Sequence, residues 1–129
     1  MKNNINIGIM GFGHIGRYIY LNSLSNPNFE VKAISDIGSS DILHYLLNSE
    51  PRNRSSVSIE GDNLIYDGIR TQFVDGTCPG DVDWESLDVD WVVDATGKFL
   101  KKESLQMHID RGAKKVILSC LRNQDLDTI

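Results

Sequence analysis

A glycine-rich segment follows a short apolar run near the N-terminus. The run occupies residues 5–10, and the segment GFGHIG spans residues 11–16. In the spacing G-x-G-x-x-G, the first glycine permits a sharp turn, the second lets a pyrophosphate approach the backbone, and the third lets a helix pack closely. Free N–H groups at the start of that helix, around His14 and Ile15, would bind the anion. The segment predicts a dinucleotide site, but the motif alone is weak evidence because glycine is common.

The acidic residue that such a site requires is also present. Asp36 follows the glycines by about 20 residues, at the end of a second predicted strand over residues 29–35. A carboxylate here accepts hydrogen bonds from the adenosine ribose and repels the 2′-phosphate of NADP, and residues 37–40 contain no compensating arginine. The order of strand, glycine turn, helix, strand and acid predicts an NAD site. The alternative is a structural turn in an unrelated parallel sheet.

Strands and helices alternate along most of the chain. Short apolar runs predict strands over residues 5–9, 29–35, 91–94 and 116–118, and helical spacing predicts helices around residues 15–22, 42–47 and 105–109. Residues 57–73 instead alternate with period two around the turns GDN and DG, which is typical of an antiparallel meander. The pattern predicts an α/β fold, a Rossmann-like doubly wound parallel sheet with a small antiparallel meander inserted.

The parallel strands would bring their carboxyl ends to one edge of the sheet. Four polar or glycine positions follow these ends, and we expect them to lie close together. They are Gly11, Asp36, Thr96 and Ser119.

Composition and charge narrow the class of protein. The 129 residues are 40% hydrophobic and 24% charged, which predicts a single globular domain. With 13 basic and 18 acidic residues and no long basic run, we expect no nucleic-acid partner. The apolar run at the N-terminus is too short for a membrane span or a signal peptide, so we expect a cytoplasmic protein. Cys78 and Cys120 form no C-x-x-C pair, which fits a reducing compartment and predicts no metal site.

Four segments in order resemble a known enzyme family. They are residues 6–17 (NIGIMGFGHIGR), 33–36 (AISD), 92–99 (VVDATGKF) and 112–119 (GAKKVILS). Together they resemble the N-terminal half of phosphorylating glyceraldehyde-3-phosphate dehydrogenases and of erythrose-4-phosphate dehydrogenases. The resemblance covers nearly the whole chain and implies NAD as the cofactor. It also implies that Thr96, Gly97 and Ser119 line the nicotinamide end of the groove and that backbone near Thr77 meets the adenine.

The motif and the resemblance together predict one set of cofactor-binding residues. These are Gly11, Phe12, Gly13, His14, Ile15, Gly16, Asp36, Thr77, Thr96, Gly97 and Ser119.

The resemblance also implies an activity for the complete enzyme. A cysteine thiolate attacks an aldehyde, hydride passes to NAD, and phosphate releases the acyl group, in a glycolytic homo-tetramer. In that family the nucleophilic cysteine and its histidine lie beyond the point that corresponds to Ile129. We therefore expect residues 1–129 to be an NAD-binding domain that lacks the catalytic domain and is inactive alone. The alternative is a non-catalytic nucleotide-binding or regulatory module.

Several reactive side chains have simpler interpretations. Cys120 lies in an S-C-x-x-N stretch, but no downstream histidine could act as its base, so we interpret it as a packing residue and predict no catalytic residue. His14 is predicted to be solvated. His44 and His108 lie in predicted helices without a partner at metal-ligand spacing, so they are expected at the surface or the edge of the core.

Two tryptophans could in principle stack against nucleic-acid bases. Trp84 and Trp91 lack an accompanying basic groove, so both are predicted to be packing residues.

Overall fold

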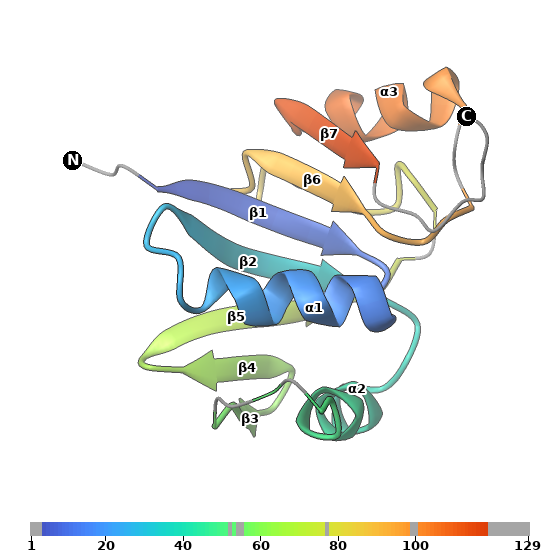
Figure 1. The fold of residues 1–129 in the computed structure, drawn as a ribbon. Helices are drawn as coiled ribbons and strands as arrows, with labels where there is room; N and C mark the ends of the chain where they lie inside the picture. The colour runs from blue at the N-terminus through green and yellow to red at the C-terminus, as the bar shows by residue number, and fades with distance from the viewer. Residues whose placement is uncertain (1–3, 52, 54–55, 77, 99–100, 119–129) are drawn as a thin grey trace.

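A computed structural model describes residues 4–51, 53, 56–76, 78–98 and 101–118. One twisted sheet runs through the molecule and carries helices on its faces (Figure 1). The elements, in chain order, are β1 (Ile5–Met10), α1 (His14–Ser23), β2 (Phe29–Ser35), α2 (Ser40–Asn48), β3 (Ser58–Glu60), β4 (Asn63–Tyr66), β5 (Ile69–Val74), β6 (Trp91–Asp94), α3 (Lys102–Asp110) and β7 (Lys115–Leu118). The predicted residues Thr77, Ser119 and Cys120 lie outside the described part of the chain.

The seven strands have the order β3-β4-β5-β2-β1-β6-β7. Strands β5, β2, β1, β6 and β7 are parallel, whereas β3, β4 and β5 pair antiparallel. The predicted α/β fold with a parallel sheet and a meander is confirmed. The meander is not a separate sheet, however, because β5 also pairs with β2, through Ala33 and Gln72 for example.

Side chains on the two faces of the sheet form two cores. Ile9 of β1 packs with Tyr20 of α1 and Leu47 of α2 in the first core. The neighbouring residue Met10 points to the opposite face and packs with Trp84 in the second. The alternation places α1 and α2 over one face and the segment around Trp84 over the other, as expected when successive side chains along a strand point to opposite sides.

Trp84 is fully buried against the central strand. Its ring packs so closely on Gly8 that a Cβ there would lie 2.5 Å from the ring. Trp91 stacks at a tilt against Phe29, with ring centroids 6.3 Å apart. Both tryptophans therefore pack against the sheet, as predicted.

All three predicted helices are present, and α1 and α2 differ at their N-caps. Ser39 is the N-cap of α2, and its hydroxyl accepts a hydrogen bond from Ile42 N, which satisfies one of the free donors of the first turn. Helix α1 has no such cap, because Gly13 at its N-cap carries no side chain. The N–H groups at the start of α1 are therefore available to another acceptor. None of the helices in the described part of the chain has the length and apolar character that crossing a membrane requires.

Candidate dinucleotide-binding site

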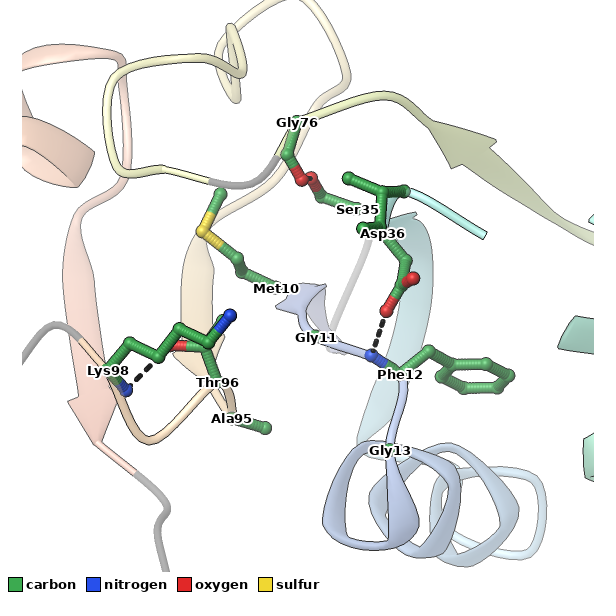
Figure 2. Close-up of a pocket in the computed structure, with 11 residues that line it drawn as sticks. Met10, Gly11, Phe12, Gly13, Ser35, Asp36, Gly76, Ala95, Thr96 and Lys98 are labelled. Carbon is green, nitrogen blue, oxygen red and sulfur yellow. Dashed lines mark hydrogen bonds between the residues drawn. The ribbon is translucent and has the colours of Figure 1, made fainter. Parts of the chain in front are cut away.

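A pocket opens at the carboxyl ends of β1, β2 and β6 (Figure 2). Strand β1 lies between β2 and β6, so the chain runs outward from β1 in both directions, and the pocket lies at this switch point. Open parallel sheets bind ligands at such crevices. The pocket is lined by Met10, Gly11, Phe12, Gly13, Ser35, Asp36, Ile37, Gly76, Ala95, Thr96 and Lys98.

The structure brings five of the predicted residues together in this pocket. These are Gly11, Phe12, Gly13, Asp36 and Thr96. His14, Ile15 and Gly16 belong to the first turns of α1, next to the pocket. Gly97 follows Thr96 but does not line the pocket.

The three glycines of the motif have different surroundings. Gly11 has a φ of 94°, which favours glycine, and a Cβ there would lie 3.1 Å from the backbone of Thr96. A Cβ on Gly13 would have no heavy atom within 4 Å, so it would project into open space. A Cβ on Gly16 would collide with the carbonyl oxygen of Gly11. The first and third glycines are thus required by the fold, whereas the second is required only if something occupies the space beside it.

Asp36 joins the end of β2 to the glycine turn. Its Oδ2 accepts a hydrogen bond from Phe12 N at 2.8 Å, and its Oδ1 accepts one from Gly38 N at 2.9 Å. Figure 2 shows the first of these bonds across the pocket. An ionised carboxylate has about four lone-pair sites, so it can accept further hydrogen bonds from a ligand. The carboxylate is thereby held in place at the pocket wall.

Arg17, which is not among the predicted site residues, supports the glycine turn from the helix side. The side chain is only 8% exposed, and its Nη1 donates to the carbonyl oxygen of Phe12 at 3.0 Å. Its Nε donates to Glu50 Oε2 at 2.6 Å, and this hydrogen bond from Arg17 lowers the pKa of Glu50. The available signal was a basic residue directly after the last glycine, but its acceptors could be identified only from the folded chain.

His14 extends from the first turn of α1 into solvent. Its side chain is 88% exposed, in agreement with the predicted solvated state. The ring Nδ1 lies 3.4 Å from Glu50 Oε2 and 3.3 Å from Arg17 Nη2. The imidazole therefore contacts the ion pair of Arg17 and Glu50 at the protein surface.

Lys98, Ser35 and Gly76 also line the pocket without having been predicted. Lys98 stands beside Thr96, across the pocket from the carboxylate of Asp36 (Figure 2). On the far wall, the Ser35 hydroxyl donates to the carbonyl oxygen of Gly76 at 2.7 Å. Lys98 adds a positive charge to the wall of the pocket, and such a charge favours an anionic ligand.

Asp94 fixes the loop that follows β6. Its Oδ1 accepts hydrogen bonds from Thr96 N at 3.1 Å and from Thr96 Oγ1 at 2.7 Å, and Oδ2 lies 3.0 Å from His108 Nε2. Burial of this carboxyl acts to raise its pKa, but the hydrogen bonds from His108 and Thr96 outweigh burial, so the pKa of Asp94 lies below its usual value.

The prediction for His108 was wrong. We expected this residue at the surface or the edge of the core, but it is completely buried. Helix α3 lays the imidazole between Asp94 and Trp84, where both ring nitrogens have hydrogen-bond partners. A polar side chain can be buried when it is fully hydrogen-bonded. His44 of α2, in contrast, is partly buried at the edge of the core, as predicted, and its Nε2 lies 2.8 Å from the carbonyl oxygen of Val57.

The lowered pKa of Asp94 predicts a specific acid sensitivity. A carboxyl whose pKa is lower in the folded state stabilises the fold above its unfolded pKa, near 3.8, and loses that contribution as the pH falls through the folded pKa. We expect the difference in unfolding free energy between the wild type and Asp94→Asn to be constant from pH 7 to pH 5 and to narrow towards pH 3. Urea unfolding at each pH measures it. A difference that stays constant down to pH 3 would contradict the assignment.

Comparisons with known proteins agree with the geometry. The model of the family described as "Glyceraldehyde 3-phosphate dehydrogenase, NAD binding domain" matches residues 5–102. A glyceraldehyde-3-phosphate dehydrogenase of Geobacillus stearothermophilus is 36% identical, and the match covers 97% of this chain and 38% of the relative. Glyceraldehyde-3-phosphate dehydrogenase 1 of Bacillus subtilis is 34% identical, and the match covers 97% of this chain and 38% of that protein. A cytosolic glyceraldehyde-3-phosphate dehydrogenase of Trypanosoma brucei brucei is 31% identical, and the match covers 89% of this chain and 36% of that protein.

The chain thus spans little more than a third of the length of these relatives. The family match includes the glycine turn, Asp36, Gly76 and the loop after β6, and these parts line the pocket. NAD is the cofactor of this domain family, and the fold is the one that binds it. The chain belongs to the family of glyceraldehyde 3-phosphate dehydrogenase NAD-binding domains.

Proposed function

We propose that this chain binds NAD in the pocket at the ends of β1, β2 and β6, and that it is the cofactor-binding part of a phosphorylating aldehyde dehydrogenase. The pyrophosphate lies beside Gly13, on the N–H groups at the start of α1. The adenosine ribose lies against Asp36, and the nicotinamide end lies towards Thr96 and Gly97. The observation that carries the proposal is the empty space beside Gly13 at an uncapped helix N-terminus.

The chemistry assigned to this chain is binding and orientation. A dinucleotide held here would present its nicotinamide to a substrate bound outside the described residues. When bound, NAD would accept the hydride in such an enzyme. By analogy with the cytosolic relative, we place the protein in the cytoplasm, in glycolysis, and we propose a homo-oligomer, a tetramer by resemblance, for the full-length form.

The proposal is tested by titration calorimetry of the 129-residue chain with NAD. We expect weak but saturable binding, because the chain presents the adenosine and pyrophosphate contacts within a single domain. With glyceraldehyde 3-phosphate or erythrose 4-phosphate, we expect no reduction of NAD by the isolated chain. Absence of any saturable heat up to millimolar NAD would overturn the proposal. Turnover by the isolated chain would overturn the assignment of a purely cofactor-binding role.

Asp36→Ala should weaken NAD binding more than NADP binding. The wild type is expected to prefer NAD, because the carboxylate accepts from the ribose hydroxyls and repels a 2′-phosphate. The substitution removes these contacts and the support for Phe12 N, so the dissociation constant for NAD should rise about tenfold, or roughly 1.4 kcal/mol, and the preference should narrow.

Competition titrations with both cofactors measure the preference. Asp41→Ala is the matched control, because it removes the same charge from the exposed first turn of α2 without touching the pocket. Equal affinities of the wild type for NAD and NADP would show that the argument from charge is wrong.

A further inference from the structure

A chain of hydrogen bonds connects the core beneath the sheet with the rim of the pocket. Trp84 Nε1 donates to His108 Nδ1 at 3.1 Å, and His108 Nε2 lies 3.0 Å from Asp94 Oδ2. The other oxygen of Asp94 accepts both hydrogen bonds from Thr96, which lines the pocket. These hydrogen bonds therefore join three separate segments of the polypeptide, around residues 84, 94 and 108, and they end at Thr96, a residue of the candidate site.

Only one arrangement of protons satisfies this chain. An indole N–H can only donate, so His108 Nδ1 must be the acceptor. In the neutral imidazole the proton then lies on Nε2, which donates to Asp94. Asp94 thus receives hydrogen bonds from His108 Nε2, Thr96 N and Thr96 Oγ1, and an ionised carboxylate can accept all three. An asparagine in its place could not, because its amide nitrogen would face another donor.

Burial prevents these side chains from finding other partners. Trp84, His108 and Asp94 are each 0% exposed. A buried polar group without a partner costs about 1–3 kcal/mol, so none of the three can turn away at low cost. Thr96 is the residue at which this series of hydrogen bonds reaches the pocket. Its Oγ1 also accepts a hydrogen bond from Lys98 N at 3.2 Å. The buried residues therefore hold the backbone of residues 96–98 in a defined position.

We propose that Trp84, His108 and Asp94 form a positioning unit for the Thr96 end of the dinucleotide pocket. The inference rests on the proposed function, because it assigns the role of the unit to NAD binding. The unit contacts no ligand itself and acts through Thr96. The adenosine end of the pocket is formed by Asp36 and the glycine turn, which have their own hydrogen bonds. Loss of the unit should therefore weaken binding of NAD and leave binding of AMP unchanged.

Three variants separate positioning from general stability. His108→Leu removes both hydrogen bonds, whereas His108→Gln places an acceptor and a donor on one amide and can restore them. Thr71→Val is the matched control, because it removes a buried hydrogen bond, from Thr71 Oγ1 to the carbonyl oxygen of Val31, in a part of the sheet outside the pocket. Urea unfolding at several temperatures gives the free energy of unfolding of each variant, and binding is measured at a temperature at which all three variants are folded.

The expected result is a split between ligands. In calorimetry, His108→Leu should raise the dissociation constant for NAD about tenfold, which corresponds to roughly 1.4 kcal/mol, and leave that for AMP within about twofold. His108→Gln should recover most of the NAD affinity, and Thr71→Val should bind both ligands like the wild type. A folded His108→Leu that binds NAD like the wild type, or that loses NAD and AMP equally, would overturn the inference.

A second readout is independent of NAD. In ¹⁵N NMR spectra of the free wild-type chain, His108 should show the tautomer with its proton on Nε2. The amide of Thr96 should shift and exchange faster in His108→Leu but not in Thr71→Val. An unchanged Thr96 amide would overturn the positioning unit. If the wild type fails to bind NAD while Thr96 responds as expected, the proposed function is wrong and the structural coupling stands.

Discussion

Gly13→Val is expected to abolish NAD binding and to leave the domain folded. A Cβ on Gly13 meets no heavy atom within 4 Å, and the backbone there has φ −84° and ψ −156°, an extended conformation that valine adopts readily. The added side chain would instead fill the place proposed for the pyrophosphate. We expect the dissociation constant for NAD to rise by at least about 100-fold, or roughly 2.7 kcal/mol.

Calorimetry with NAD, together with urea unfolding, measures both parts of this prediction. Gly61→Val is a comparison at another open glycine, outside the pocket, although its φ of 62° adds backbone strain that Gly13 does not have. It should lose stability but keep its affinity for NAD at a temperature where it is folded. Undiminished binding by a folded Gly13→Val would place the pyrophosphate elsewhere.

Gly16→Ala should have the opposite effect and destabilise the fold itself. A Cβ on Gly16 would collide with the carbonyl oxygen of Gly11 and would touch Ile9 of β1 at 3.4 Å. Neither a backbone carbonyl nor a buried strand can move without separating α1 from the sheet. We expect a loss of about 2–3 kcal/mol in the free energy of unfolding, as for other substitutions that overpack a core.

The matched control for this prediction is Gly13→Ala. It adds the same methyl group three residues earlier, in open space, and its unfolding free energy should stay within about 1 kcal/mol of the wild type, because a poorer N-cap is offset by lower entropy of the unfolded chain. Urea unfolding of both variants gives the comparison. Equal stabilities would contradict the assignment of Gly16 to the close contact between helix and turn.

The local parts of this fold could be predicted from the sequence because short-range chemistry determines them. The turn at Gly11 needs a positive φ, which glycine adopts readily, and the Ser39 side chain caps α2. The switch from helical spacing to period two identified the meander. These signals each lie within about ten residues, where hydrogen-bonding and steric preferences act directly.

The long-range contacts could not be predicted in the same way. The hydrogen bonds of His108 depend on how α3 docks against the segment that carries Trp84, and nothing adjacent to His108 in the sequence indicates that docking. Arg17 reaches Glu50 across 33 residues, and β5 joins β2 across about 40. Polar groups of this kind become identifiable only when the fold has brought their partners together.

The pocket combines both kinds of contact. Gly11, Gly13 and Asp36 were identified from spacing, whereas Lys98, Ser35 and the support of Thr96 by Asp94 emerged only from the folded structure. Thr77 and Ser119 lie outside the described residues, so their roles in cofactor binding remain predictions.

If NAD binds with its pyrophosphate on the glycine turn, the amides of that turn should respond when NAD is titrated into the isotope-labelled chain. In ¹H–¹⁵N spectra, we expect the largest chemical-shift changes at the amides of residues 11–15, next to Gly13, with further changes at residues 36–38 and 96–97. AMP should reproduce the shifts at residues 36–38 but not those at residues 96–97. Largest shifts around the apolar pocket lined by Tyr18, Trp91 and Ile117, with residues 11–15 unaffected, would contradict this placement of the pyrophosphate.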